Sequence, residues 1–234
     1  MDEGGVEVLD LPLDIAEADI WSILGSRDGP FPALADDVAE GLALARDLCT
    51  PRGLRRDLKV DRIGPSDVTF VDGPSLDGKF MAHLFEGAQE AAFLVLTVGP
   101  SLEAKVSETA AAGDTVEAII LDAVGSAAAM GLLTHVLGRI SRETEARGWN
   151  TGACLSPGLS YWDVTGQETI FRMLPADMIG LELLESSFLK PQKSQTAVVP
   201  MGPEMKVHGD ADQSFCRYCP ATNCPLRREA QVIV

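Results

Sequence analysis

The sequence predicts an α+β domain in which a twisted, mostly antiparallel sheet packs against one long central helix. Two patterns indicate this fold class. Segment 114–147 is the longest run with apolar residues at helical spacing, and segment 91–98 is the most apolar run of strand length. Gly99 and Pro100 follow this strand directly. We therefore expect the strand to end there and to lie near the centre of the sheet.

The remaining elements are shorter and alternate along the chain. Apolar residues at three- and four-residue spacing predict helices at 14–24, 32–48, 102–111 and 167–174. Short apolar runs between turn residues predict strands at 56–63, 67–72, 80–84, 181–184 and 196–199.

Small residues fill the middle of the long helix from Gly125 to Gly131, so we expect other backbone to approach closely there. The same helix contains a stretch, 118–138, that is long enough to span a bilayer. Asp122 and His135 interrupt this stretch, and an aspartate inside a membrane span costs about 2.5–3.5 kcal/mol. The prediction is therefore a buried core helix without membrane contact.

The chain is strongly acidic. Its 234 residues include 35 Asp and Glu against 19 Lys and Arg, which gives a formal net charge of −16. This charge argues against general nucleic-acid binding, because phosphate contacts need Lys and Arg. One local basic run consists of Arg52, Arg55, Arg56, Lys59 and Arg62. We interpret it as a solvated strand and loop; the alternative is a docking patch for an acidic partner or a phosphate-bearing ligand.

Three of the five cysteines stand close together, at Cys216, Cys219 and Cys224. Their Cys-x2-Cys-x4-Cys spacing suits an iron–sulfur cluster or a zinc ion, with a fourth ligand from elsewhere: Cys154, Cys49, His208 or a small molecule. The alternatives are idle surface thiols or a disulfide with Cys49 or Cys154.

The acidic start lacks the basic segment of a signal peptide. Together with the cysteine usage, this leads us to expect a cytoplasmic protein, and in the cytoplasm such clusters more often hold metal than a disulfide.

The last third of the chain carries the most specific pattern. Its parts are Ser156-Pro157-Gly158, Tyr161-Trp162, Gln167, Ile179-Gly180 and Pro191-Gln192-Lys193-Ser194. This pattern resembles the activation (reactivation) domain of cobalamin-dependent methionine synthase, and above all its free-standing relatives, many of which end in a similar cysteine cluster. The resemblance extends to the strand–Gly–helix segment 97–103 and to Asp122-Ala-Val-Gly-Ser in the long helix.

The resemblance implies a function. Domains of that family present S-adenosylmethionine to the cobalt of cobalamin while an electron is delivered. By analogy, we expect residues 1–205 to form the activation domain-like part and 206–234 a cysteine-rich metal-binding tail. The expected partner is a corrinoid protein or methyltransferase, with cobalamin supplied by that partner. The expected cofactor-binding residues are Ser156, Pro157, Gly158, Tyr161 and Trp162.

Two function classes stay open at this stage. In the first, an iron–sulfur site in the tail relays electrons to cobalt, as part of cobalamin-dependent methyl transfer or reductive reactivation. In the second, the chain is a non-enzymatic binding protein on the same scaffold, with a structural zinc ion. The sequence assigns no catalytic residue in either case.

The chain departs from the family pattern at three positions. Cys154 stands where the family has an arginine, Leu159 where it has a tyrosine, and Met130 near its acidic helix residue. An arginine holds a carboxylate by a two-pronged contact that a cysteine cannot make. We therefore expect S-adenosylmethionine to bind weakly or not at all, and we expect Cys154 to be the fourth metal ligand.

Overall fold

The computed structural model describes residues 5–26, 29–159 and 162–205. Among these residues, seven strands form one sheet in the order β4-β3-β2-β5-β9-β6, with β1 also beside β2, and every pairing is antiparallel. The strands are β1 (Val6–Asp10), β2 (Arg52–Ile63), β3 (Asp67–Phe70), β4 (Ser75–Asp77), β5 (Glu90–Thr97), β6 (Asn150–Thr151) and β9 (Ser194–Gly202). A separate hairpin pairs β7 (Glu182–Leu183) with β8 (Leu189–Lys190).

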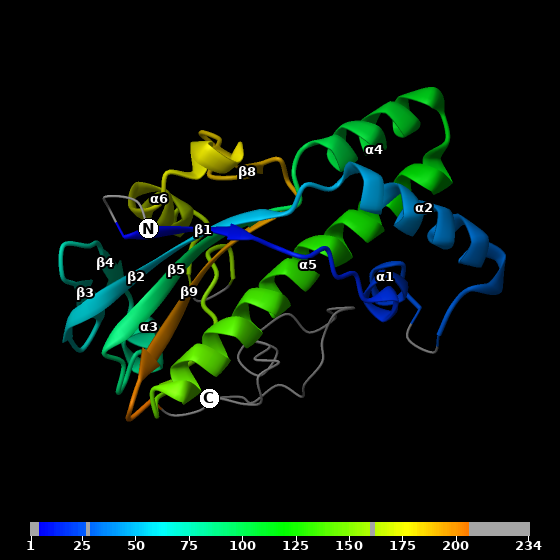
Figure 1. Ribbon diagram of the computed structural model, residues 1–234. Helices are drawn as coiled ribbons and strands as arrows, with labels where there is room; N and C mark the ends of the chain where they lie inside the picture. Colours follow the sequence, from blue (N-terminus) through cyan, green and yellow to red (C-terminus); the bar gives the residue numbers. More distant parts are fainter. Residues whose placement is uncertain (1–4, 27–28, 160–161, 206–234) are drawn as a thin grey trace.

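The helices cover the two faces of this sheet unequally. The long helix α5 runs obliquely across one face with α1, α2 and α4 around it, and α3 and α6 lie on the other side (Figure 1). Their bounds are α1 (Glu17–Ile23), α2 (Ala35–Leu48), α3 (Lys79–Leu84), α4 (Ser101–Ala112), α5 (Thr115–Ala146) and α6 (Gly166–Met173). Two 3-10 turns precede α2 and follow α6, at Pro32–Leu34 and Ala176–Ile179.

Strand β5 separates two hydrophobic cores. Side chains alternate between the faces of a strand, and in β5 both faces are buried. One core, beneath α5, receives Ala92, Leu94 and Leu96. The core on the α3 and α6 side receives Ala91, Phe93 and Val95. The continuous apolar run at 91–98 is therefore explained by two buried faces, and its predicted central position is confirmed by β2 and β9 on either side.

Helix α5 is 32 residues long, which corresponds to about 48 Å. Its small residues allow the close approaches that the sequence predicts. A Cβ atom on Gly125 would lie 3.1 Å from Leu102 Cδ2 of α4, and one on Gly131 would collide with the backbone carbonyl of Asp14. By length and composition the helix could cross a membrane, but 56% of its most apolar window is buried inside the protein.

An ion-pair network ties α5 to the sheet. The Arg55 side chain of β2 is 9% exposed, and its guanidinium binds both carboxylate oxygens of Asp57 at 2.8 Å and Glu143 of α5 at 2.5 Å. Arg139 binds the same Glu143 at 2.7 Å and Glu7 of β1 at 2.6 Å. The predicted solvation of the basic run is therefore correct only in part. Alternate residues of β2 face opposite sides of the sheet, and Arg55 is buried on the α5 side.

Some predicted elements need correction. Segment 80–84 is not a strand: it lies within helix α3, which packs on β3 and β4. β2 begins four residues before the predicted strand, at Arg52, and the sequence reasoning missed β1 altogether. The α+β class, the antiparallel sheet and the long central helix are confirmed.

Candidate functional site

The end of β5 and the start of β9 form a hydrogen-bonded junction around Thr97. This side chain is 1% exposed. Its hydroxyl oxygen accepts a bond from the backbone N–H of Gly99 at 3.0 Å and one from the Ser194 hydroxyl at 2.8 Å. Gly99 has φ 85°, and a Cβ there would collide with Thr50, so the turn requires glycine. The strand–Gly–helix segment is thus joined directly to the Pro-x-Lys-Ser segment.

Lys193 extends this junction to the long helix. Its side chain is only 13% exposed, and its ammonium lies 2.7 Å from Asp122 Oδ1 and 2.9 Å from Ser126 Oγ. The missing side chain of Gly125 leaves room for the lysine stem, since a Cβ there would lie 3.2 Å from Lys193 Cγ. On the other side, Glu103 in the first turn of α4 accepts the backbone N–H of Gln192 at 2.5 Å.

The Ser-Pro-Gly loop begins beside β9, which also contributes to this junction. Leu155, directly before the loop, pairs with Val198 of β9. Ser156 and Pro157 are half-buried, while Gly158, with φ 89°, is exposed at the turn. Gly158 is therefore the most exposed residue of the Ser-Pro-Gly segment.

Trp162 closes the base of the loop. The backbone N–H of Gly158 donates to the carbonyl of Trp162 at 2.9 Å, and that of Trp162 donates to Leu159 at 2.8 Å. The indole is 9% exposed and packs so closely on Gly166 that a Cβ there would collide with it. Trp162 therefore supports the loop as part of the core. The other aromatic residue of the predicted set, Tyr161, lies outside the described residues.

Gln167, at the start of α6, is a candidate functional residue because its side chain is polar, buried and not fully hydrogen-bonded within the described part of the chain. It is 8% exposed, and among the described residues no donor reaches its side-chain oxygen Oε1. Leaving a buried acceptor unpaired costs about 1–3 kcal/mol, so this oxygen requires a donor that the described residues do not supply. The sequence pattern contained Gln167, but only the structure identifies its unpaired oxygen.

The predicted metal ligands are only partly within the described residues. Cys216, Cys219 and Cys224 lie outside them. Within the described ranges no group of three or more His, Cys, Asp or Glu side chains is placed to hold a metal ion. Cys154 is 3% exposed, in the core beneath α5. Burial raises the pKa of its thiol to about 12, against the opposing hydrogen bond of Ser156. Its role as a ligand remains a prediction, and this role would require the tail to reach a core thiol.

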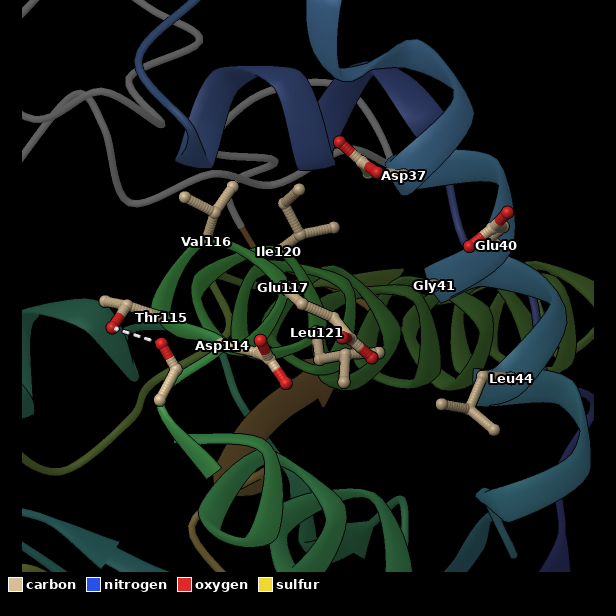
Figure 2. Close-up of a pocket in the computed structure, with 11 residues that line it drawn as sticks. Asp37, Glu40, Gly41, Leu44, Asp114, Thr115, Val116, Glu117, Ile120 and Leu121 are labelled. Atoms are coloured by element: carbon tan, nitrogen blue, oxygen red, sulfur yellow. Dashed lines mark hydrogen bonds between the residues drawn. The ribbon is translucent and has the colours of Figure 1, made fainter. Parts of the chain in front are cut away.

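A separate cleft of about 680 Å³ opens between α2 and the first turns of α5. Figure 2 shows the carboxylate side chains of Asp37, Glu40, Asp114 and Glu117 around it, and the apolar side chains of Val116, Ile120 and Leu121 also line it. None of the motif residues lines it. This acidic cleft is therefore a feature distinct from the junction, and its charge would repel a phosphate-bearing ligand.

The fold and the junction together define a protein with the architecture of a methionine synthase reactivation domain. The crystal structure of the MetH reactivation domain bound to AdoHcy superposes with a TM-score of 0.65, over 88% of this chain and 81% of that one. Sequence identity is 14%, so the similarity establishes the fold and confirms the resemblance at that level. No family model and no curated protein matches the sequence.

Proposed function

We propose that the protein is an activation or redox partner of a corrinoid protein. The observation that carries the proposal is the junction: three segments far apart in the sequence meet at Thr97, Lys193 and Asp122. These segments belong to the pattern that resembles the methionine synthase activation domain, and they meet within the fold of that domain. In this proposal the cobalamin is the substrate, carried by the partner, and the exposed backbone at Gly158 faces incoming ligand.

The finer part of the proposal concerns the tail. Three thiolates at Cys-x2-Cys-x4-Cys spacing fit an iron–sulfur cluster, with one ligand contributed from elsewhere. When bound, such a cluster supplies single electrons at low potential, which is what reduction of cob(II) to cob(I) consumes. The protein's own residues have a positioning role: Thr97, Lys193 and Glu103 hold the end of β5 and the start of β9 against α5 and α4.

Metal and sulfide analysis with electron paramagnetic resonance on anaerobically purified protein tests the tail. We expect stoichiometric iron and sulfide, lost in Cys216→Ser, Cys219→Ser and Cys224→Ser variants and retained in the buried control Cys49→Ser. A Cys154→Ser variant decides whether that thiol is the fourth ligand. Stoichiometric zinc without sulfide would eliminate the redox role and favour the non-enzymatic alternative with a structural zinc ion.

Electron transfer is tested separately, with free cob(II)alamin as the acceptor. Dithionite-reduced protein, freed of excess dithionite, should produce the absorbance of cob(I)alamin in proportion to its cluster content. The Cys219→Ser variant is the matched control. Equal reduction by wild type and this variant would remove the tail from the reaction.

S-adenosylmethionine binding is expected to be weak. The thiol of Cys154 faces the core beneath α5, where it can neither contact nor neutralise a ligand carboxylate. Calorimetric titration with S-adenosylmethionine and with S-adenosylhomocysteine tests this expectation. A dissociation constant in the low micromolar range, equivalent to about −8 kcal/mol, would overturn it and would indicate that backbone groups around Gly158 and the Gln167 oxygen suffice.

A further inference from the structure

A second cavity lies on the face of the sheet opposite α5. It has a volume of about 390 Å³ and opens where the end of α6 and the turn after it meet β1 and β2. The described residues that line it are six apolar side chains and two arginines, with no carboxylate among them: Val6, Arg56, Phe171, Arg172, Met173, Leu174, Pro175 and Met178. This volume is within the usual range of about 300–1,000 Å³ for small-molecule sites.

Arg56 differs from its neighbour in the basic run of β2. Arg55 points to the α5 side, where Asp57 and Glu143 neutralise it. Arg56 points to the opposite side, is half-buried, and forms no ion pair with a described carboxylate. Its Nη1 makes one long hydrogen bond, 3.4 Å, to the backbone carbonyl of Met173. This contact holds the guanidinium at the cavity wall and leaves donors available for a ligand.

Arg172 supplies the second charge. It is exposed near the end of α6, and its Nη2 donates to the Thr169 hydroxyl at 3.0 Å. It too forms no ion pair within the described part of the chain. Two guanidinium groups that line one cavity give it a positive potential, which favours an anion there. The chain has 35 acidic against 19 basic residues, and Arg62, Arg139 and Arg147 each bind a carboxylate. Arg56 and Arg172 differ from them, because neither binds a described carboxylate.

We propose that this cavity binds a small amphipathic anion. Its carboxylate, phosphate or sulfonate group would lie between Arg56 and Arg172, because guanidinium groups form two-pronged charge-assisted hydrogen bonds to such groups. An aromatic or branched aliphatic body would lie on Phe171, Leu174 and Met178, whose side chain is 53% exposed at the cavity mouth. The site is independent of the proposed corrinoid function, since the junction at Thr97 and the tail cysteines contribute nothing to its lining.

Fluorescence titration with 8-anilinonaphthalene-1-sulfonate tests the site, with uncharged N-phenyl-1-naphthylamine as the matched probe. We expect one sulfonate probe per chain. In an Arg56→Gln/Arg172→Gln variant its affinity should fall at least about tenfold, equivalent to about 1.4 kcal/mol, while the naphthylamine affinity stays unchanged. Arg46→Gln/Arg142→Gln is the control for net charge, because it also removes two positive charges, from exposed arginines of α2 and α5 that form no ion pair with a described residue. Circular dichroism checks that each variant is folded.

The binding position is read independently from methyl-labelled methionine. The sulfonate probe should shift the methyl resonances of Met173 and Met178 and leave that of Met130, in α5, in place. Benzoate should compete with the probe, and benzyl alcohol should not. Equal losses of affinity in the control and in the Arg56→Gln/Arg172→Gln variant, unchanged affinity in the Arg56→Gln/Arg172→Gln variant, or shifts confined to other methionines would each overturn the proposal.

Discussion

The Arg55 network predicts an asymmetry between two ways of breaking the same ion pairs. The Arg55 side chain is 9% exposed, whereas Asp57 and Glu143 are 36% and 41% exposed. In an Asp57→Asn/Glu143→Gln variant the guanidinium remains in the protein without a counter-charge. Removing the partner of a buried charge costs about 3–5 kcal/mol. We expect a loss of unfolding free energy of this size.

The opposite variant, Arg55→Met, should cost less. It keeps most of the packing of the arginine stem. Glu143 keeps its contact with Arg139, and Asp57, which loses its ion pair, can be hydrated because it is partly exposed. The loss is then that of the charged hydrogen bonds, about 1.5–3 kcal/mol, reduced by this hydration to about 1–2 kcal/mol. Glu143→Gln alone leaves the two-pronged Asp57 contact in place and should cost about 1 kcal/mol.

Urea unfolding followed by circular dichroism measures these differences, with the slope against urea checked for constancy across variants. The order of the losses is the test. If Arg55→Met destabilises the protein as much as the double variant does, or more, the residual buried charge is not the dominant cost. A double variant within about 1 kcal/mol of wild type would show that Arg55 reaches water without its partners.

Three further predictions concern acid sensitivity, thiols and the loop. Burial alone would raise the pKa of Glu143, but hydrogen bonds and the charges of Arg55 and Arg139 lower it below its usual value of 4.5. Its stabilisation is therefore present above about pH 4.5 and lost as the pH falls through the lowered pKa. The stability gap between wild type and Glu143→Gln should shrink from about pH 6 to pH 3 in urea unfolding, and a constant gap would contradict this. Burial raises the pKa of Cys49 to about 11 and that of Cys154 to about 12. Both should resist iodoacetamide at about pH 8 until the protein is denatured; rapid native labelling of Cys154, read by mass spectrometry, would place it outside the core. Gly166→Ala should displace the Trp162 indole, alter the near-ultraviolet circular dichroism and cost about 1–3 kcal/mol. Gly138→Ala, at an open helical position, should instead be neutral or stabilising by up to about 1 kcal/mol, and equal effects of the two would refute the packing argument.

The sequence reasoning succeeded where one pattern was long and failed where it was short. The 91–98 strand and the 114–147 helix could be predicted because each pattern extends over eight or more residues. In the structure they correspond to β5 and α5. Segment 80–84 is too short for a helix period to be distinguished from a buried strand. Its helical state is fixed by packing on β3 and β4, which the sequence does not display.

The same distinction applies to the sites. The parts of the motif could be recognised one by one, but the contact between Lys193 and Asp122 spans 71 positions and has no signature in spacing. The arginine cavity combines residues of β1, β2 and α6. The sequence reasoning included Arg56 in a basic run as a solvated residue. It could not show that Arg55 and Arg56 have opposite surroundings until the pairing of β2 with β5 fixed which face each one occupies.

The two cavities place opposite charges on opposite sides of the sheet. The acidic cleft lies among the helices on the α5 side of the sheet, and the arginine cavity lies on the α6 side. The four carboxylates of the cleft and the two guanidinium groups of the cavity, which form no ion pair with a described residue, together contribute a dipole component across the sheet. The electric field of a charged partner exerts a torque on this dipole and turns the molecule before the two proteins touch. A charged partner would therefore approach one side of the sheet more often than the other. Added salt would weaken this orienting effect before it altered any short-range contact, because screening acts first on charges that are far apart.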